Sequence, residues 1–236
     1  GEEGIGREPA AGLSLGEYSA LYAAGVFSGD DAIATVALRG RAMEEAAAGL
    51  ECGMTAVLSL DRDKLQQACD KASDLGLVQI CNYNCPGQLV IGGEKEAVEA
   101  ASQYARELGA KRCMPLKVSG PFHTGLMKPA GDALAAHFRT MTFREPSIPV
   151  YFTCLGDKRE GQTIPELLER QVQSSVYWED TIRAMERDGI DTVLEIGPGK
   201  ALSGFFKKTA PEIKTYHIDT ADDYRAFVSA WKGESQ

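Results

Sequence analysis

The sequence predicts an α/β protein in which a parallel sheet, covered by helices on both faces, carries a small α+β subdomain inserted into its chain. Two patterns predict this class. Short apolar strands alternate with segments of helical spacing through most of the chain, and the stretch 54–117 changes to a different order of elements. At 236 residues the chain is long enough to bury the core of one large domain and a smaller insert.

The N-terminal part predicts a strand followed by two helices. Residues 9–12 form a short run of small residues expected to be a strand, and helical spacing begins at Leu15 and ends at Gly25. Ser28 is a candidate cap for the second helix, whose apolar stripe is bordered by Arg39. That stripe is expected to consist of Ile33, Val36, Gly40, Met43 and Ala47.

The stretch 54–117 predicts six elements in the order βαββαβ. Strands are expected at 54–60, 77–84, 87–93 and 111–119, and helices at 61–73 and 94–109. This order is typical of ferredoxin-like subdomains. We therefore expect a ferredoxin-like insert at 51–117 and an α/β body formed by 1–50 together with 118–236.

The remainder of the body continues the alternation of helices and strands. Helices are expected at 124–138, 164–172 and 178–188, and strands at 149–153, 191–196 and 215–218. The turn Gly197-Pro198-Gly199-Lys200 follows one of these strands and precedes another helix. It lacks the spacing of a phosphate-binding P-loop and is expected to be a simple strand-to-helix turn.

Composition and charge exclude several classes of function. The formal net charge of −9 and the isoelectric point near 5.0 disfavour general affinity for nucleic acid. No apolar run approaches the roughly 18 residues that a membrane span needs, so we expect a cytoplasmic protein without membrane contact. The six cysteines form no CxxC pair and only three histidines are present, which favours reduced structural thiols over a metal site.

The stretch Gly12-Leu13-Ser14-Leu15-Gly16 lies between the first predicted strand and the first predicted helix. A GxSxG sequence in that setting is typical of the nucleophile elbow of hydrolase-like α/β proteins, a tight turn that exposes a serine hydroxyl above the sheet. N–H groups at the start of the helix can stabilise a developing oxyanion. The alternative is that Ser14 only caps the helix.

A serine nucleophile needs a base, and the three histidines lie in different settings. His137 falls within a predicted helix and His217 within a predicted strand, where packing or surface roles are expected. His123 ends the stretch Ser119-Gly120-Pro121-Phe122-His123 at a strand-to-helix junction, the kind of loop where parallel sheets place their chemistry. His123 is therefore the candidate base for Ser14.

Four separated blocks of sequence carry a resemblance to a known family. They are GLSLGEYSALYAAGVFSGDDAIATVALRGRAM, NYNCPGQLVIGG, SGPFHTGLMKPAGDAL and LEIGPGKALSGFFKK. In this order they resemble the malonyl-CoA:acyl carrier protein transacylases, the standalone acyltransferases of type II fatty acid synthesis. The resemblance extends over nearly the whole chain and includes the spacing of Ser14, Arg39 and His123.

The resemblance implies a reaction and the residues that carry it. In a ping-pong transfer, His123 takes the proton of Ser14, Ser14 attacks the thioester of malonyl-CoA, and the pantetheine thiol of acyl carrier protein then collects the malonyl group. The N–H of Leu15 is implied as an oxyanion donor. The main-chain carbonyl of Gln171 is implied as the group that orients the imidazole, without a triad carboxylate. No cofactor is implied.

Arg39 is the candidate ligand for the malonyl carboxylate, because a planar guanidinium beside an apolar face can bind a carboxylate through two hydrogen bonds. The alternative is a surface arginine whose stem covers the apolar stripe. Further pocket residues are implied at Leu13, Phe122, Asn82 and Asn84. Phe122 resembles the malonyl-selecting version of related acyltransferases, whereas Asn82 and Asn84 are equally consistent with buried asparagines at strand ends.

Binding of the carrier protein requires a local basic surface. Acyl carrier proteins are acidic, and this chain is also acidic overall. We expect docking to use lysines near the motifs. The candidates are Lys117, Lys128, Lys200, Lys207 and Lys208.

The sequence departs from the family pattern in two places. Leu13 stands where the common pattern has histidine. The family's opening strand and its glutamine-containing glycine-rich loop, which supplies a second oxyanion N–H, have no counterpart here. The resemblance therefore implies an N-terminally truncated chain with weak activity, because losing one oxyanion donor costs about 10² to 10³ in turnover.

Two other functions stay open from the sequence alone. A serine esterase of the α/β-hydrolase type would need a catalytic carboxylate between Ser14 and His123, in a stretch that the ferredoxin-like insert occupies. An inactive carrier-protein docking module would need no nucleophile. Reaction with malonyl-CoA separates the three, because only the transferase accumulates an acyl group on Ser14.

Overall fold

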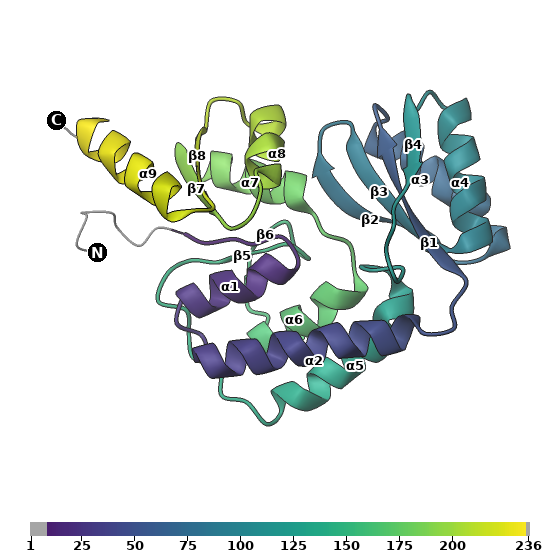
Figure 1. Ribbon diagram of the computed structural model, residues 1–236. Helices are drawn as coiled ribbons and strands as arrows, with labels where there is room; N and C mark the ends of the chain where they lie inside the picture. The colour runs from purple at the N-terminus through teal and green to yellow at the C-terminus, as the bar shows by residue number, and fades with distance from the viewer. Residues whose placement is uncertain (1–8, 235–236) are drawn as a thin grey trace. The chain divides into compact units, whose positions relative to one another are not determined.

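A computed structural model describes residues 9–234 of the chain (Figure 1). These residues fall into two compact units, one up to Thr181 and the other from Ile182 onward. Helices and strands are interspersed in both units, so the predicted α/β class is confirmed. The predicted boundaries of the insert, 51–117, stay a prediction. Within the described residues no helix combines the length and the apolar character needed to cross a membrane.

The first unit contains a layer of packed helices. These are α1 (Leu15–Ala23), α2 (Gly29–Ala47), the 3-10 turn η2 (Gly125–Met127), α5 (Lys128–Phe138) and α6 (Ile164–Gln173). α2 packs on α1 and α5, and α5 packs on α6 (Figure 1). Ser28 caps α2 by accepting a hydrogen bond from the Asp31 N–H at 3.1 Å, and Thr163 forms a capping box with Glu166 at the start of α6.

The buried face of α2 differs from the predicted one. Ile33 is 72% exposed and Gly40 is also exposed, against the prediction. The buried face consists of Thr35, Arg39, Ala42, Met43 and Ala47. The polar residues on it have partners, since the Thr35 hydroxyl lies 3.2 Å from His137 Nε2 and Arg39 hydrogen bonds within the site described below. Met43 and Ala47 are buried as predicted, whereas Thr35 and Arg39 escape apolar spacing because they are polar.

The second part of this unit is a four-stranded antiparallel sheet with two helices. Its elements are β1 (Cys52–Leu58), α3 (Arg62–Ala72), the 3-10 turn η1 (Ser73–Leu75), β2 (Val78–Cys85), β3 (Gln88–Glu94), α4 (Lys95–Glu107) and β4 (Arg112–Pro115). The strand order is β2-β3-β1-β4, and each neighbouring pair is antiparallel. The predicted βαββαβ order is therefore confirmed. β3 lies between the two strands of the first βαβ unit, and β1 lies between the two strands of the second.

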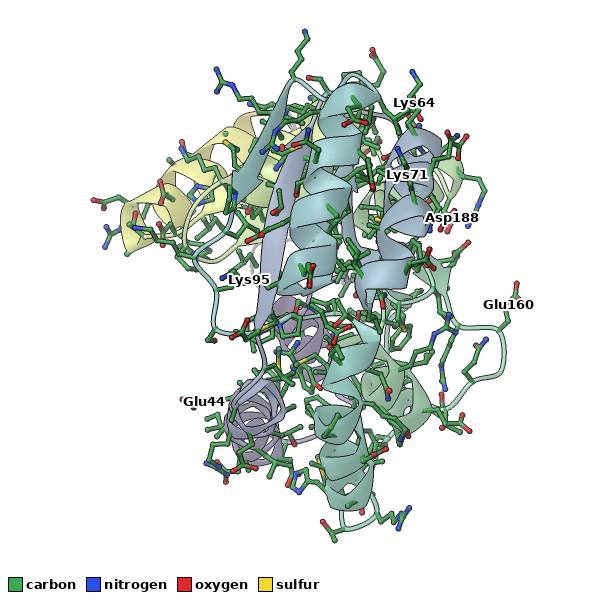
Figure 2. All side chains as sticks on the ribbon, turned by 90° about the vertical axis from the view of Figure 1, so that its right-hand side faces the viewer. Glu44, Lys64, Lys71, Lys95, Glu160 and Asp188 are labelled. Carbon is green, nitrogen blue, oxygen red and sulfur yellow. The ribbon has the colours of Figure 1, made fainter. Side chains whose placement is uncertain are left out.

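The two faces of this sheet are covered differently. α3 and α4 pack on one face, and Figure 2 shows Lys64 and Lys71 on this helical side of the sheet. The opposite face presents a small apolar cluster against which Phe122 packs. That cluster consists of Met54, Ala56, Cys81 and Val90.

The strand predicted at 9–12 is a single parallel bridge between Ala10 and Val150. The Ala10 N–H donates to the Pro149 carbonyl at 2.9 Å, and the Ala10 carbonyl accepts from the Tyr151 N–H at 3.0 Å. A proline precedes the bridge on both segments and has no N–H to donate, so the ladder does not extend.

The strand predicted at 149–153 is also shorter. β5 (Tyr151–Phe152) pairs with β6 (Asp157–Lys158) in an antiparallel hairpin that the sequence analysis did not predict. A second isolated parallel bridge joins Asn82 to Val176 and connects β2 to the segment that follows α6.

The second unit contains a parallel strand pair. β7 (Thr192–Ile196) and β8 (Lys214–Ile218) pair in parallel and are connected through α8 (Ala201–Thr209). α7 (Trp178–Arg187) leads into this unit. These elements fall where they were predicted, but α9 (Ala221–Glu234) was missed. A signal for α9 exists, because the Thr220 hydroxyl and the Asp223 carboxylate each accept from the other's N–H.

Candidate active site

Ser14 occupies a strained turn immediately before α1. Its φ of 52° and ψ of −104° lie outside the regions that residues other than glycine ordinarily adopt. Gly12 permits the turn, because a Cβ at Gly12 would overlap the main chain of Gly16 and Glu17. A Cβ at Gly16 would meet nothing within 4 Å. The first glycine of the GxSxG sequence is therefore required by space and the second is not.

The hydroxyl of Ser14 meets the imidazole of His123. Ser14 Oγ lies 2.8 Å from His123 Nε2, and His123 Nδ1 lies 2.9 Å from the main-chain carbonyl oxygen of Gln171. A carbonyl can only accept, so the Nδ1–H donates to it and Nε2 is left to accept the Ser14 proton. These three residues come from the start of α1, the loop before η2 and the end of α6. The geometry is that of a nucleophile, a base and a group that orients the base.

Burial keeps the His123 ring neutral. The residue is 5% exposed, and its φ of 61° lies in the left-handed region. Desolvation, and after it the positive charge of Arg39, lower the pKa of His123 to about 4. At neutral pH the ring therefore carries no charge and can accept a proton.

Arg39 reaches the same hydroxyl from the buried face of α2. Its Nη2 donates to Ser14 Oγ at 2.8 Å and to the side-chain oxygen of Gln171 at 3.4 Å. Its Nε has no hydrogen-bond acceptor among residues 9–234, and the guanidinium carbon lies 5.5 Å from the centre of the Tyr18 ring. Arg39 is 6% exposed, so it is not the surface arginine of the alternative interpretation. A buried guanidinium with an unused donor beside the nucleophile can bind an anionic group there.

Glu17 is a buried charged residue that the sequence analysis missed. Its side chain is fully buried, and one carboxylate oxygen accepts from the N–H and the hydroxyl of Thr153, both at 2.8 Å. Burial raises the pKa of Glu17 to about 7, against the opposing effect of these two hydrogen bonds. A signal was available, because Glu17 precedes buried Leu21 by four residues and therefore shares its helix face.

Three predicted site residues lie next to this centre. Leu13 directly precedes Ser14 and is half-buried. Leu15 is the first residue of α1, so its N–H has no partner within the helix and its side chain is 51% exposed. Phe122 packs against both the core of the helical layer and the open face of the small sheet.

The two predicted asparagines lie on β2 and are half-buried. Within residues 9–234, neither the Asn82 nor the Asn84 side chain hydrogen bonds Ser14, His123 or Arg39. The strand is nevertheless connected to the site through the chain, because the Val176 N–H donates to the Cys81 carbonyl at 2.9 Å, five residues after Gln171.

The remaining candidates of the sequence analysis lie apart from this centre or stay untested. His137 is on α5 beside Thr35, and His217 is on β8. Lys128 pairs with Asp132 on its own helix at 2.6 Å, and Lys200, Lys207 and Lys208 belong to the other compact unit. All six cysteines are free. In the part of the chain that the structure describes, no three His, Cys, Asp or Glu side chains come together in a metal-binding group.

Comparison with known proteins identifies the family of the chain. The family model of the acyl transferase domain matches residues 3–225. The malonyl CoA-acyl carrier protein transacylase of Bacillus subtilis is 43% identical over 236 residues, which cover 99% of this chain and 74% of the relative. The chain belongs to the malonyl CoA-acyl carrier protein transacylase family. It is therefore an acyltransferase.

Two solved structures of this transacylase family match the fold. The malonyl CoA-acyl carrier protein transacylase from Clostridium perfringens has a TM-score of 0.95 at 35% identity, covering 99% of this chain and 74% of that one. A malonyl-transacylase in complex with a type II PKS acyl-carrier protein has a TM-score of 0.89 at 39% identity, covering 95% and 74%.

The two glycines of the elbow are predicted to differ in their tolerance of substitution. Gly12→Ala is expected to lower acyl transfer by about 100-fold or more, because the added Cβ displaces the turn that positions Ser14. Gly16→Ala is the matched control and is expected to keep activity within about threefold. Steady-state rates of both variants measure the difference, and similar losses in the two would contradict the assigned packing.

Glu17 is predicted to make stability depend on pH. Because its pKa is raised from 4.5 to about 7, the folded state keeps a proton in this range that the unfolded state has lost, so stability falls as the pH rises from 4.5 to 7. Glu17→Gln removes this dependence and is expected to be more stable than wild type by about 3 kcal/mol at pH 8, with little difference at pH 4.5. Urea unfolding at both pH values tests this. A difference independent of pH would rule it out.

Proposed function

We propose that the chain transfers a malonyl group from coenzyme A to the phosphopantetheine thiol of acyl carrier protein, in fatty acid biosynthesis, through a malonyl ester on Ser14. The observation that carries this proposal is the buried Arg39 guanidinium, 2.8 Å from the Ser14 hydroxyl that His123 also contacts. A nucleophile and its base support acyl transfer in general, and the cation beside them supports an acyl group with its own carboxylate. The names of the relatives at 43% and 35% identity support the same reaction.

In the first half-reaction, Ser14 Oγ attacks the thioester carbonyl of malonyl-CoA while His123 Nε2 takes its proton. The Gln171 carbonyl, 2.9 Å from His123 Nδ1, stabilises the imidazolium that forms. The carbon–sulfur bond then breaks, and the coenzyme A thiolate leaves with the proton from Nε2. The product is a malonyl ester on Ser14.

In the second half-reaction, the same groups act in the reverse direction. His123 Nε2 takes the proton of the carrier protein's thiol, and the sulfur attacks the ester carbonyl. The carbon–oxygen bond to Ser14 breaks, and the serine oxygen recovers its proton from His123. In both halves, negative charge develops on the acyl oxygen, for which the Leu15 N–H at the start of α1 is the candidate donor in this chain.

Arg39 holds the malonyl carboxylate during both steps. In a malonyl ester, one methylene separates the carboxylate from the ester carbonyl, so a group that contacts Ser14 Oγ is also close to the carboxylate. The guanidinium is 6% exposed, and a bidentate ion pair formed there is weakly screened by water. Leu13, Phe122, Asn82 and Asn84 are assigned to the pocket wall on the basis of the resemblance.

The chemistry requires no cofactor, since the thioester is already activated and the base is a side chain. Acyl carrier protein is the second substrate, which is supported by the complex of a similar malonyl-transacylase with its carrier. A cytoplasmic location is part of the proposal, because thiol substrates need a reducing compartment.

Incubation with malonyl-CoA tests the proposal directly. Intact-mass analysis of the purified chain is expected to show one malonyl group on Ser14, which acyl carrier protein then removes. Ser14→Ala is the control and is expected to show none. Release of malonate without an accumulating adduct would instead indicate an esterase, and no reaction would indicate a docking module.

Arg39→Ala is expected to lose malonyl transfer selectively. Leaving a buried carboxylate unpaired costs about 3 to 5 kcal/mol, which corresponds to roughly 100- to 3,000-fold in kcat/KM. Acetyl transfer has no carboxylate to pair and is expected to fall less. Competition between malonyl-CoA and acetyl-CoA measures the ratio, and equal losses on both would remove Arg39 from this role.

A further inference from the structure

Gln171 contacts all three candidate residues of the site at once. Its main-chain carbonyl accepts from His123 Nδ1 at 2.9 Å. Its side-chain amide donates from Nε2 to the main-chain carbonyl of Ser14 at 2.9 Å, and Oε1 accepts from Arg39 Nη2 at 3.4 Å. The residue is 1% exposed. The resemblance implies only a main-chain contact for Gln171, so these two side-chain hydrogen bonds are additional.

The two partners fix the orientation of the amide. The Ser14 carbonyl has no proton and can only accept, so it requires the NH₂ end of the amide. The Arg39 guanidinium has no acceptor, so it requires the oxygen end. Exchanging the two ends would leave both contacts repulsive. A buried side chain with a single allowed orientation is well suited to hold its partners in place.

The Ser14 carbonyl needs such a partner. The residue has a φ of 52° and a ψ of −104°, a conformation that costs of order 1 to 3 kcal/mol and persists only where its surroundings hold it. The Ser14 carbonyl also accepts from the Glu17 N–H, at 3.2 Å, which is longer than the 2.9 Å contact from Gln171. The hydrogen bond from the Gln171 amide is therefore shorter than the one from the Glu17 N–H.

We infer that Gln171 is a positioning residue through its side chain. The amide holds the Ser14 turn and the Arg39 guanidinium in a fixed position relative to each other. This inference rests on the proposed function and adds to it a link between the nucleophile and the carboxylate-binding group. Without the amide, the Ser14 carbonyl loses a hydrogen bond that restrains its backbone. Arg39 Nη2 then keeps Ser14 Oγ as an acceptor but loses Gln171 Oε1.

The main-chain and side-chain roles can be separated by substitution. Every residue at position 171 keeps a carbonyl for His123, so only the two side-chain bonds change. Gln171→Met has a similar length and shape without the amide. Gln173→Met is the matched control, because Gln173 is on the same helix and, among residues 9–234, its amide hydrogen bonds the Glu169 carbonyl within α6, at 3.2 Å, and no residue of the site.

Two measurements compare these variants with wild type. Labelling of Ser14 by a fluorophosphonate probe needs no malonyl group, and Gln171→Met is expected to slow it about 10-fold relative to Gln173→Met. In malonyl transfer, kcat/KM is expected to fall by about 10- to 100-fold, because a hydrogen bond to the charged Arg39 is also lost. The acid limb of the pH profile is expected to stay where it is in wild type, since the His123 contact is unchanged.

Gln171→Glu provides a second variant that keeps the size of the side chain but replaces the amide N–H donor with a charged acceptor. Its carboxylate would pair with Arg39 and compete with the substrate carboxylate, so the KM for malonyl-CoA is expected to rise at least about 10-fold while the KM for acetyl-CoA changes little. A melting curve for each variant confirms that it is folded.

The outcomes distinguish this inference from the proposed function. Labelling and transfer by Gln171→Met that match Gln173→Met would overturn the inference, as would equal KM changes for the two thioesters in Gln171→Glu. If wild type labels with the probe but forms no malonyl ester, the proposed function fails. In that case the labelling rates alone still decide whether the Gln171 amide holds the Ser14 turn.

Discussion

The imidazole of His123 is held at both of its ring nitrogens, and the rest of the site depends on this. Nε2 meets the Ser14 hydroxyl and Nδ1 meets the Gln171 carbonyl, so three distant segments have to converge within hydrogen-bond distance. The helical layer achieves this, because α2 packs on α1 and α5, and α5 on α6. Gly120 brings the histidine loop against the end of α2, where a Cβ would approach the Ala47 side chain to 2.7 Å.

Exclusion of water determines which groups are charged around this imidazole. Burial lowers the pKa of His123 to about 4 and raises that of Glu17 to about 7, so desolvation pushes both toward their neutral forms near neutral pH. Arg39 is buried as well, but a guanidinium retains its proton far more strongly than either of these groups. The site is therefore dominated by one fixed positive charge, and an anionic acyl group is the substrate that such a charge selects.

Much of this arrangement could be predicted from the sequence. The parts that were not predicted were missed for one common reason. The βαββαβ order followed from apolar periodicity, and Ser14 and His123 followed from their positions at element junctions. The buried face of α2 was predicted only in part, because Thr35 and Arg39 are polar and periodicity counts only apolar residues. Glu17 and the Gln171 side chain were missed for a similar reason. A buried polar side chain depends on partners that are distant in the chain, and one sequence does not identify those partners, although helical spacing places Glu17 on the face of Leu21.

The acceptor for His123 Nδ1 belongs to the backbone, and this has a genetic consequence. In a triad that uses an aspartate, a single codon change removes the group that aligns the base. Here a codon change at position 171 alters the side chain and leaves the main-chain carbonyl. The alignment of the base therefore depends on the end of α6 and not on which amino acid occupies position 171. Drift at this position can therefore alter how the Ser14 turn and Arg39 are held while the base keeps its alignment.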